Sequence, residues 1–170
     1  MVTTAVRTNV KVQAHIHSTV YVANELIRIA QAVIDARSLP TDYMHQHGTL
    51  FTESFRYWLA GRHLERMTIE VYDPTSDQLI ERFDLALDYG RSADDEYFET
   101  LIDKVEASLA GLGVLPPGCR YRVIVSLADG APDLPGWQST EYRDASHLRQ
   151  QNIGLVIGAP RIGVSMDFWA

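Results

Sequence analysis

The sequence contains only one cysteine, Cys119, among its 170 residues. A single cysteine excludes an internal disulfide and a cysteine-rich zinc site, and it is typical of a protein in a reducing compartment. Long apolar runs are also missing, since none approaches the roughly 18 residues of a membrane span. The N-terminal region lacks the apolar core of a signal peptide. We therefore expect a cytoplasmic protein without a membrane segment.

Basic residues are scarce as well. The chain has 15 Lys and Arg against 22 Asp and Glu, which gives a formal net charge of -7. Proteins that bind the phosphate backbone of nucleic acids need clustered Lys and Arg, so direct binding to nucleic acid is not expected. The length and the 46% hydrophobic content predict a single globular domain.

Motifs of common active sites are missing too. Gly111-Leu112-Gly113 lacks the third glycine of a dinucleotide fingerprint and follows a predicted helix instead of a strand. There is no Gly-x-Ser-x-Gly elbow, and Cys119 has no neighbour in the sequence that marks it as a nucleophile. We therefore predict that the protein is not an enzyme and has no cofactor.

Two His-x-His pairs, His15/His17 and His45/His47, are the only hint of a metal site. Alternate residues of a strand point to one side and could chelate a metal ion, but no Cys, Asp or Glu accompanies either pair at a recognised spacing. Asp73 and Asp77 supply too few oxygens for a calcium loop and indicate a hairpin turn. No metal site is predicted, and a small His-dependent metalloenzyme remains the weaker alternative.

Apolar periodicity predicts the first half of the chain. Residues 10–16 alternate apolar and polar side chains, which indicates a half-buried strand. Ser18 is the expected N-cap of a helix that ends at Pro40 and is apolar except for one polar stripe. The stripe consists of Asn24, Arg28, Gln31 and Asp35. A polar linker then leads to a second helix over residues 50–60, which Gly61 closes.

Further along, residues 67–71 and 83–89 alternate around a turn and predict an antiparallel hairpin. Ser92 and the acidic residues after it indicate the start of a third helix. Its expected buried face consists of Phe98, Leu101, Ile102, Val105 and Leu109. Residues 121–127 predict a strand covered on both faces or nearly so.

The tail, residues 132–170, is too apolar for a disordered segment and too broken for a compact unit. Its large apolar side chains are Trp137, Leu155, Val156, Ile157, Ile162, Val164, Phe168 and Trp169. We expect the tail to dock on the rest of the protein, with residues 132–151 crossing it and residues 152–170 supplying a strand.

Three segments and the aromatic close FW carry a resemblance to a known family. The segments are HSTVYVANELI, EVYDPTSDQLIERFDLALDYG and PDLPGWQSTEYRDASHLRQQ. With them in this order, the chain resembles the bacterial HORMA-domain proteins encoded beside cyclic-oligonucleotide synthases in antiphage defence operons of the CBASS type.

The resemblance implies an α+β fold with a central, mainly antiparallel sheet, three helices behind it and a C-terminal segment called the safety belt. It implies a single HORMA domain over residues 1–170. Residues 1–17 would be a detachable N-terminal strand, residues 18–130 the core and residues 131–170 the safety belt.

The resemblance also implies a function without catalysis. Such proteins close the safety belt around a closure-motif peptide, which a sibling HORMA protein or another protein supplies. The closed form binds and activates a cyclic-oligonucleotide synthase, and an AAA+ ATPase of the pachytene-checkpoint type engages the N-terminal segment and opens the domain. A peptide-binding adaptor without a synthase partner is the alternative.

From its place in such a fold, we expect the peptide to pair with the second hairpin strand, because strand addition needs a sheet edge. The predicted peptide-binding residues are Phe83, Leu85 and Leu87 on that strand and Ile153, Leu155 and Ile157 on the belt that covers it. The alternative is that these six residues simply fill the core.

Overall fold

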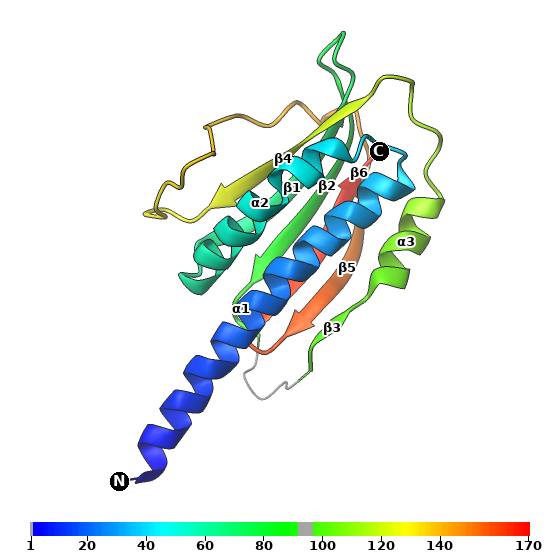
Figure 1. The fold of residues 1–170 in the computed structure, drawn as a ribbon. Helices are drawn as coiled ribbons and strands as arrows, with labels where there is room; N and C mark the ends of the chain where they lie inside the picture. Colours follow the sequence, from blue (N-terminus) through cyan, green and yellow to red (C-terminus); the bar gives the residue numbers. More distant parts are fainter. Residues whose placement is uncertain (1, 92–96) are drawn as a thin grey trace.

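The computed structural model describes residues 2–91 and 97–170, and their side chains from residue 15 onward. In this part of the chain, three helices lie on one face of a six-stranded antiparallel sheet (Figure 1). The elements are α1 (Val2–Ala36), α2 (Asp42–Ala60), β1 (Leu64–Tyr72), β2 (Leu79–Asp88), β3 (Glu99–Thr100), α3 (Ile102–Ala110), β4 (Arg120–Leu127), β5 (Gln150–Ala159) and β6 (Ile162–Trp169).

The strand order of the sheet is β3-β5-β6-β2-β1-β4. β1 and β2 form the predicted hairpin, in which Met67 lies opposite Leu85. β5 and β6 form a second hairpin from the end of the chain, and β6 pairs with β2 along residues 82–88. The C-terminal hairpin therefore belongs to the middle of the sheet, and β4 lies at one edge.

The core lies between the sheet and α1. The fully buried side chains of α1 include Val22, Leu26, Ile29 and Val33. Helix α2 adds Phe55 and Trp58, and the sheet adds residues such as Ile69 and Met166. The predicted polar stripe of α1 is exposed throughout, at Asn24, Arg28, Gln31 and Asp35. A helix that is nearly all apolar, with a single exposed polar stripe, is typical of a helix packed on several sides.

The prediction of a strand over residues 10–16 is wrong, because α1 begins at Val2. No glycine or proline precedes Pro40, and extending a helix costs far less free energy than starting one. An alternation of seven residues also makes a strand only if a sheet edge is available to it, and no such pairing forms. Ser18 is consequently a fully buried residue inside α1 and not an N-cap.

The predicted linker before the second helix is also wrong in part, because α2 begins at Asp42. The residues read as linker form its first turns, where Met44 is buried and the ring of Tyr43 packs edge-on against Tyr121 at 5.4 Å. The expected end of the helix is confirmed, with Gly61 as the C-cap. Tertiary packing has extended the helix over polar residues that have no strong preference of their own.

The expected helix start at Ser92 lies outside the described residues. α3 begins at Ile102, so Phe98 precedes the helix, where it is 44% exposed and packs edge-on against Tyr21. Val105 and Leu109 are buried as predicted. The predicted strand over residues 121–127 is confirmed as β4, with Val123 and Ile124 buried on opposite faces.

No helix in residues 2–91 and 97–170 is both long and apolar enough to cross a bilayer.

A buried ion pair joins the end of α1 to the sheet. The Arg37 guanidinium donates to both carboxylate oxygens of Glu81 on β2, at 2.9 and 2.7 Å, and to the carbonyl oxygen of Gly113 at 2.5 Å. Burial raises the pKa of Glu81, and the hydrogen bonds from Arg37 oppose that rise. The pair therefore fixes the loop after α3 against α1 and β2.

We predict that Arg37→Met lowers the free energy of unfolding at pH 7 by about 3–5 kcal/mol, because it leaves the Glu81 charge buried without its partner. Without Arg37, burial alone acts on Glu81, so its folded-state pKa rises further above the unfolded value. The folded variant then binds the extra proton, and its deficit against the wild type shrinks as the pH falls from 7 towards 5. Urea unfolding at both pH values checks this. An equal deficit at both would contradict the assignment, and Arg37→Met/Glu81→Leu should recover most of the loss.

Candidate functional site

The crossing segment, which we define as residues 128–149, connects β4 to β5 without helix or strand. In Figure 1 it runs from yellow to orange along the outside of the sheet, beyond β4. Since β4 and β5 lie near opposite edges of the sheet, the segment must pass across a face of the sheet to reach β5.

Its first half is attached to α2. The indole N–H of Trp58 donates to the carbonyl oxygen of Pro132 at 3.0 Å, and the indole N–H of Trp137 donates to the hydroxyl of Ser54 at 2.9 Å. The Trp137 ring also packs against three aromatic rings of α2, with centroid distances of 5.5 Å to Phe51, 6.3 Å to Phe55 and 5.2 Å to Trp58. We call Pro132 and Trp137 the helix-side anchor.

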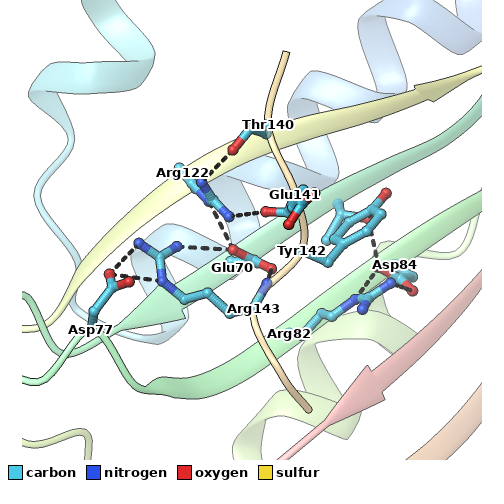
Figure 2. A network of polar contacts seen from close by, with 10 residues as sticks. Glu70, Asp77, Arg82, Asp84, Arg122, Thr140, Glu141, Tyr142 and Arg143 are labelled. Carbon is cyan, nitrogen blue, oxygen red and sulfur yellow. Dashed lines mark hydrogen bonds and ion pairs between the residues drawn. The ribbon is translucent and has the colours of Figure 1, made fainter. Parts of the chain in front are cut away.

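Its second half lies on the opposite face of the sheet, where Glu70 of β1 is completely buried. Figure 2 shows this carboxylate between two arginines. Arg122 of β4 donates to it at 2.8 Å, and Arg143 of the crossing segment donates through its guanidinium and through its backbone N–H, both at 2.9 Å. Arg143 also bonds to Asp77 at 3.0 and 2.6 Å. A buried carboxylate between two guanidinium groups is held by charge-assisted hydrogen bonds.

Tyr142 lies beside this cluster. Its hydroxyl is 2.5 Å from the hydroxyl of Ser126 on β4, and the guanidinium of Arg82 lies 4.2 Å above its ring. Arg82 is in turn held by a two-pronged contact with the buried Asp84, at 3.0 and 2.9 Å. We call Tyr142 and Arg143 the outer anchor.

The two anchors hold the crossing segment on opposite faces of the sheet. Residues 132–137 contact α2 on the helix side, and residues 140–143 contact Arg122, Ser126 and Glu70 on the other side. Between them, Gln138 and Ser139 are exposed. The crossing segment therefore passes around the outer edge of β4.

The backbone of β4 at this edge is open to a further strand. The N–H of Ala128 donates to the carbonyl oxygen of His63 beside β1, and strand residues alternate in the side to which their N–H and C=O point. The even-numbered residues of β4 thus bond to β1, and Val123, Val125 and Leu127 point outward. The outward N–H of Val123 is already used, because Tyr43, whose pKa burial raises, takes a hydrogen bond from it. The groups open to a further strand are therefore those of Val125 and Leu127. No strand lies beyond β4 within the described residues.

A cleft of about 470 Å³ lies along this edge. We call it the edge cleft. β4 contributes Val123, Ile124, Val125 and Leu127, and the crossing segment contributes residues 133–134 and 137–140 from the other side. The cleft thus combines unpaired strand groups with apolar side chains and is closed over by a segment of the same chain.

The six residues predicted to bind a peptide lie elsewhere. Phe83, Leu85 and Leu87 are on β2, and Ile153, Leu155 and Ile157 are on β5. β6 separates the two strands and pairs with β2 at the place given to the peptide. Phe83, Leu85 and Ile157 are buried in the core. The structure thus does not bring these six together, and their role in binding stays a prediction.

Sequence reasoning missed the edge of β4 and the residues of the edge cleft. The signal was present as the strand YRVIVSL followed closely by the segment PDLPGW, but an edge can be assigned only when the strand order is known.

The histidine pairs are on helices, where residues two apart point to different sides. His15 contacts the carbonyl oxygen of Ala60 through Nε2 at 3.1 Å, and the His47 ring packs on Tyr43 at 4.7 Å. Among the residues whose side chains are described, no group of three or more His, Cys, Asp or Glu could hold a metal ion. Burial raises the pKa of the Cys119 thiol, which disfavours the reactive thiolate.

We predict that Arg143→Ala loosens the crossing segment, because Glu70 loses one of its two guanidinium partners. Amide hydrogen exchange in residues 138–147 should accelerate. The free energy of unfolding should fall by about 1.5–3 kcal/mol, the usual contribution of a hydrogen bond to a charged group. Arg120→Ala, at an exposed residue of β4, is the matched control. Unchanged exchange in residues 138–147, with only a general loss of stability, would show that Arg143 does not hold the segment.

The model of one protein family, bacterial HORMA domain 2, matches residues 7–170. No curated protein matches the sequence. Among solved structures, a chain of the mitotic checkpoint complex superposes with a TM-score of 0.76 at 11% identity, covering 90% of this chain and 98% of that chain.

Two further structures are similar. C. elegans HTP-2 bound to the HIM-3 closure motif gives a TM-score of 0.68 at 16% identity, covering 87% of this chain and 89% of that chain. The E. coli MS115-1 HORMA:CdnC:Trip13 complex gives 0.58 at 11% identity, covering 89% and 87%. At such identities the similarity shows the fold, so the expected α+β HORMA fold is confirmed. Because the family model spans nearly the whole sequence, the chain belongs to the bacterial HORMA domain 2 family.

Proposed function

We propose that this protein is a non-catalytic signalling adaptor that holds a closure-motif peptide as an added strand beside β4. The crossing segment is then its safety belt. The observation that carries the proposal is the free edge of β4, whose outward backbone groups face a cleft that the same chain encloses. An extended peptide satisfies such groups by strand addition.

The position of the belt explains how a peptide would be retained. A strand in the edge cleft is bordered on the helix side by Trp137 and on the outer side by Gln138, Ser139 and Thr140. It can leave only along its own axis or after one anchor has opened. Retention therefore depends on the belt contacts as well as on the peptide's own hydrogen bonds, which favours slow release.

The site predicted from sequence, at Phe83, Leu85 and Leu87, would require β6 to leave β2. That exchange breaks a ladder of seven residue pairs, whereas a peptide at β4 leaves every strand pair of the sheet intact. We therefore favour β4 as the site in the arrangement described, and we assign the β2 edge to an arrangement in which the C-terminal hairpin has detached.

Two of the similar structures support a role in peptide binding and in signalling. HTP-2 is bound to a closure motif in its complex, and the E. coli HORMA protein is in a complex with CdnC and Trip13. By analogy, the closed form of this chain binds and activates a cyclic-oligonucleotide synthase in antiphage defence, and an AAA+ ATPase of the pachytene-checkpoint type reopens it. The start of α1 extends beyond the sheet in Figure 1, which makes it accessible to such an ATPase.

We predict that Val125→Pro abolishes peptide binding and preserves the fold. The Val125 N–H points away from β1, and proline is tolerated in an edge strand where the N–H faces outward. The measurement is the dissociation constant, by fluorescence polarisation, of a labelled peptide selected from a phage-displayed random library on the wild-type protein.

Val125→Ala is the matched control, because it shortens the side chain and keeps the N–H. Thermal unfolding of both variants checks the fold. Equal affinity of a folded Val125→Pro variant and the control would place the peptide somewhere other than the edge of β4.

The signalling step has its own test. We expect a candidate cyclic-oligonucleotide synthase to make product only when both this protein and the selected peptide are present, with product measured by chromatography. Adding the ATPase with ATP should lower the output, and deleting residues 1–14, which precede the contact of His15 with Ala60 of α2, should prevent that decrease. If the synthase activity does not depend on this protein, the alternative function is favoured, namely a peptide-binding adaptor that has no synthase partner.

A further inference from the structure

The two sides of the edge cleft differ in polarity. On the helix side it is lined by Val125, Leu127, Leu134 and Trp137. Leu134 and Trp137 are only partly buried, although both pack against the core. Two large apolar side chains from an irregular segment are thus left facing the cleft with part of their surface uncovered.

The apolar side has few unused hydrogen-bonding groups. The indole N–H of Trp137 is bonded to Ser54, and that of Trp58 is bonded to the carbonyl oxygen of Pro132. A polar side chain placed against these rings would lose its water without gaining a partner there, and burying an unpaired polar group is costly. An apolar side chain has no such cost.

The outer side differs in chemistry. It is lined by Ile124 of β4 and by the exposed Gln138, Ser139 and Thr140. Arg122 lies beside them and donates to the hydroxyl of Thr140 and to the carbonyl oxygen of Glu141. These groups remain in contact with water, so a polar side chain can stay hydrated there.

A strand added to β4 meets both sides in turn, because successive side chains of a strand point to opposite faces of the sheet. Every second side chain enters the apolar side, and its two neighbours lie on the outer side. A volume of about 470 Å³ also has to hold the backbone of the strand, which leaves room for one large side chain in the apolar part.

We infer that the edge cleft selects peptides by one large apolar anchor, of the size of Leu, Met or Phe, which inserts between β4 and the Leu134–Trp137 part of the crossing segment. The cleft selects only weakly among the peptide residues on either side of the anchor. This inference rests on the proposed function and adds the chemical class of peptide that the site takes.

The test compares peptide selections on matched variants. A phage-displayed library of random seven-residue peptides is selected on the wild type, on Leu134→Trp, which fills the apolar side, and on Leu134→Ala, which enlarges it. Glu106→Ala, at an exposed residue of α3 outside the cleft, is the control. The wild type and the control should enrich a large apolar residue at one position, Leu134→Trp should shift that position to Ala or Val, and Leu134→Ala should shift it to Phe or Trp.

Synthetic peptides give the magnitude. Replacing the anchor by Ala should weaken binding to the wild type by about 10- to 100-fold, the equivalent of burying one large apolar side chain. Replacing either neighbour by Ala should change the affinity less than about threefold, as expected for a hydrated position.

The outcomes separate the two proposals. If no peptide is enriched on any folded variant, peptide binding itself is contradicted, and the anchor with it. If peptides bind and Val125→Pro abolishes their binding, but their preferred residue is the same on Leu134→Trp and Leu134→Ala, the anchor is wrong and the proposed function stands. Thermal unfolding identifies any variant that fails to fold, in which case Val125→Ala serves as the enlarged cleft.

Discussion

The pairing of β6 with β2 is the constraint on which the rest of the structure depends. It puts the C-terminal hairpin in the middle of the sheet and leaves β4 at an edge. The chain must then travel from β4 to β5, across four inter-strand spacings or about 19 Å. The crossing segment of about 22 residues could span roughly 70 Å when extended. The surplus length is what allows it to pass around the edge of β4 on the helix side before it crosses the outer face.

The same pairing makes the burial of Glu70 conditional on the position of the crossing segment. The Glu70 side chain lies on the face of the sheet opposite the helices, where Arg143 and Tyr142 cover it. If the segment moved away, water could reach the carboxylate and Arg143 would lose its partner. Burying this charge pair under the crossing segment has a desolvation cost, which the hydrogen bonds of the pair must offset. Its geometry therefore has to be complete, as it is here, where Arg143 contributes both its guanidinium and its backbone N–H.

Local pattern predicted much of the body of the protein and little of the candidate site. The β1–β2 hairpin, the polar stripe of α1 and the end of α2 at Gly61 depend on residues close in sequence, and the structure has all three. The start of α1 was misjudged because an alternation at residues 10–16 says nothing about whether a partner strand exists. The edge cleft depends on β6 reaching β2 across about 80 residues of chain, and contacts of such separation leave no periodic trace in either strand. The resemblance to HORMA proteins supplied the fold, but the edge that stays free had to come from the strand order.

The two anchors of the crossing segment differ in the physics that stabilises them. The helix-side anchor is an aromatic cluster around Trp137, so its strength follows buried apolar area and does not depend on ionic screening. The outer anchor contains the buried Glu70 contacts and also the exposed Asp77, which is 73% accessible and therefore screened by ions. The anchors lie on opposite faces, and the exposed Gln138 and Ser139 connect them. Under the proposed function, a peptide needs only one anchor to open in order to enter sideways. Complete release of the segment needs both anchors to open, and that larger cost is the reason an external ATPase would be required to reset the adaptor.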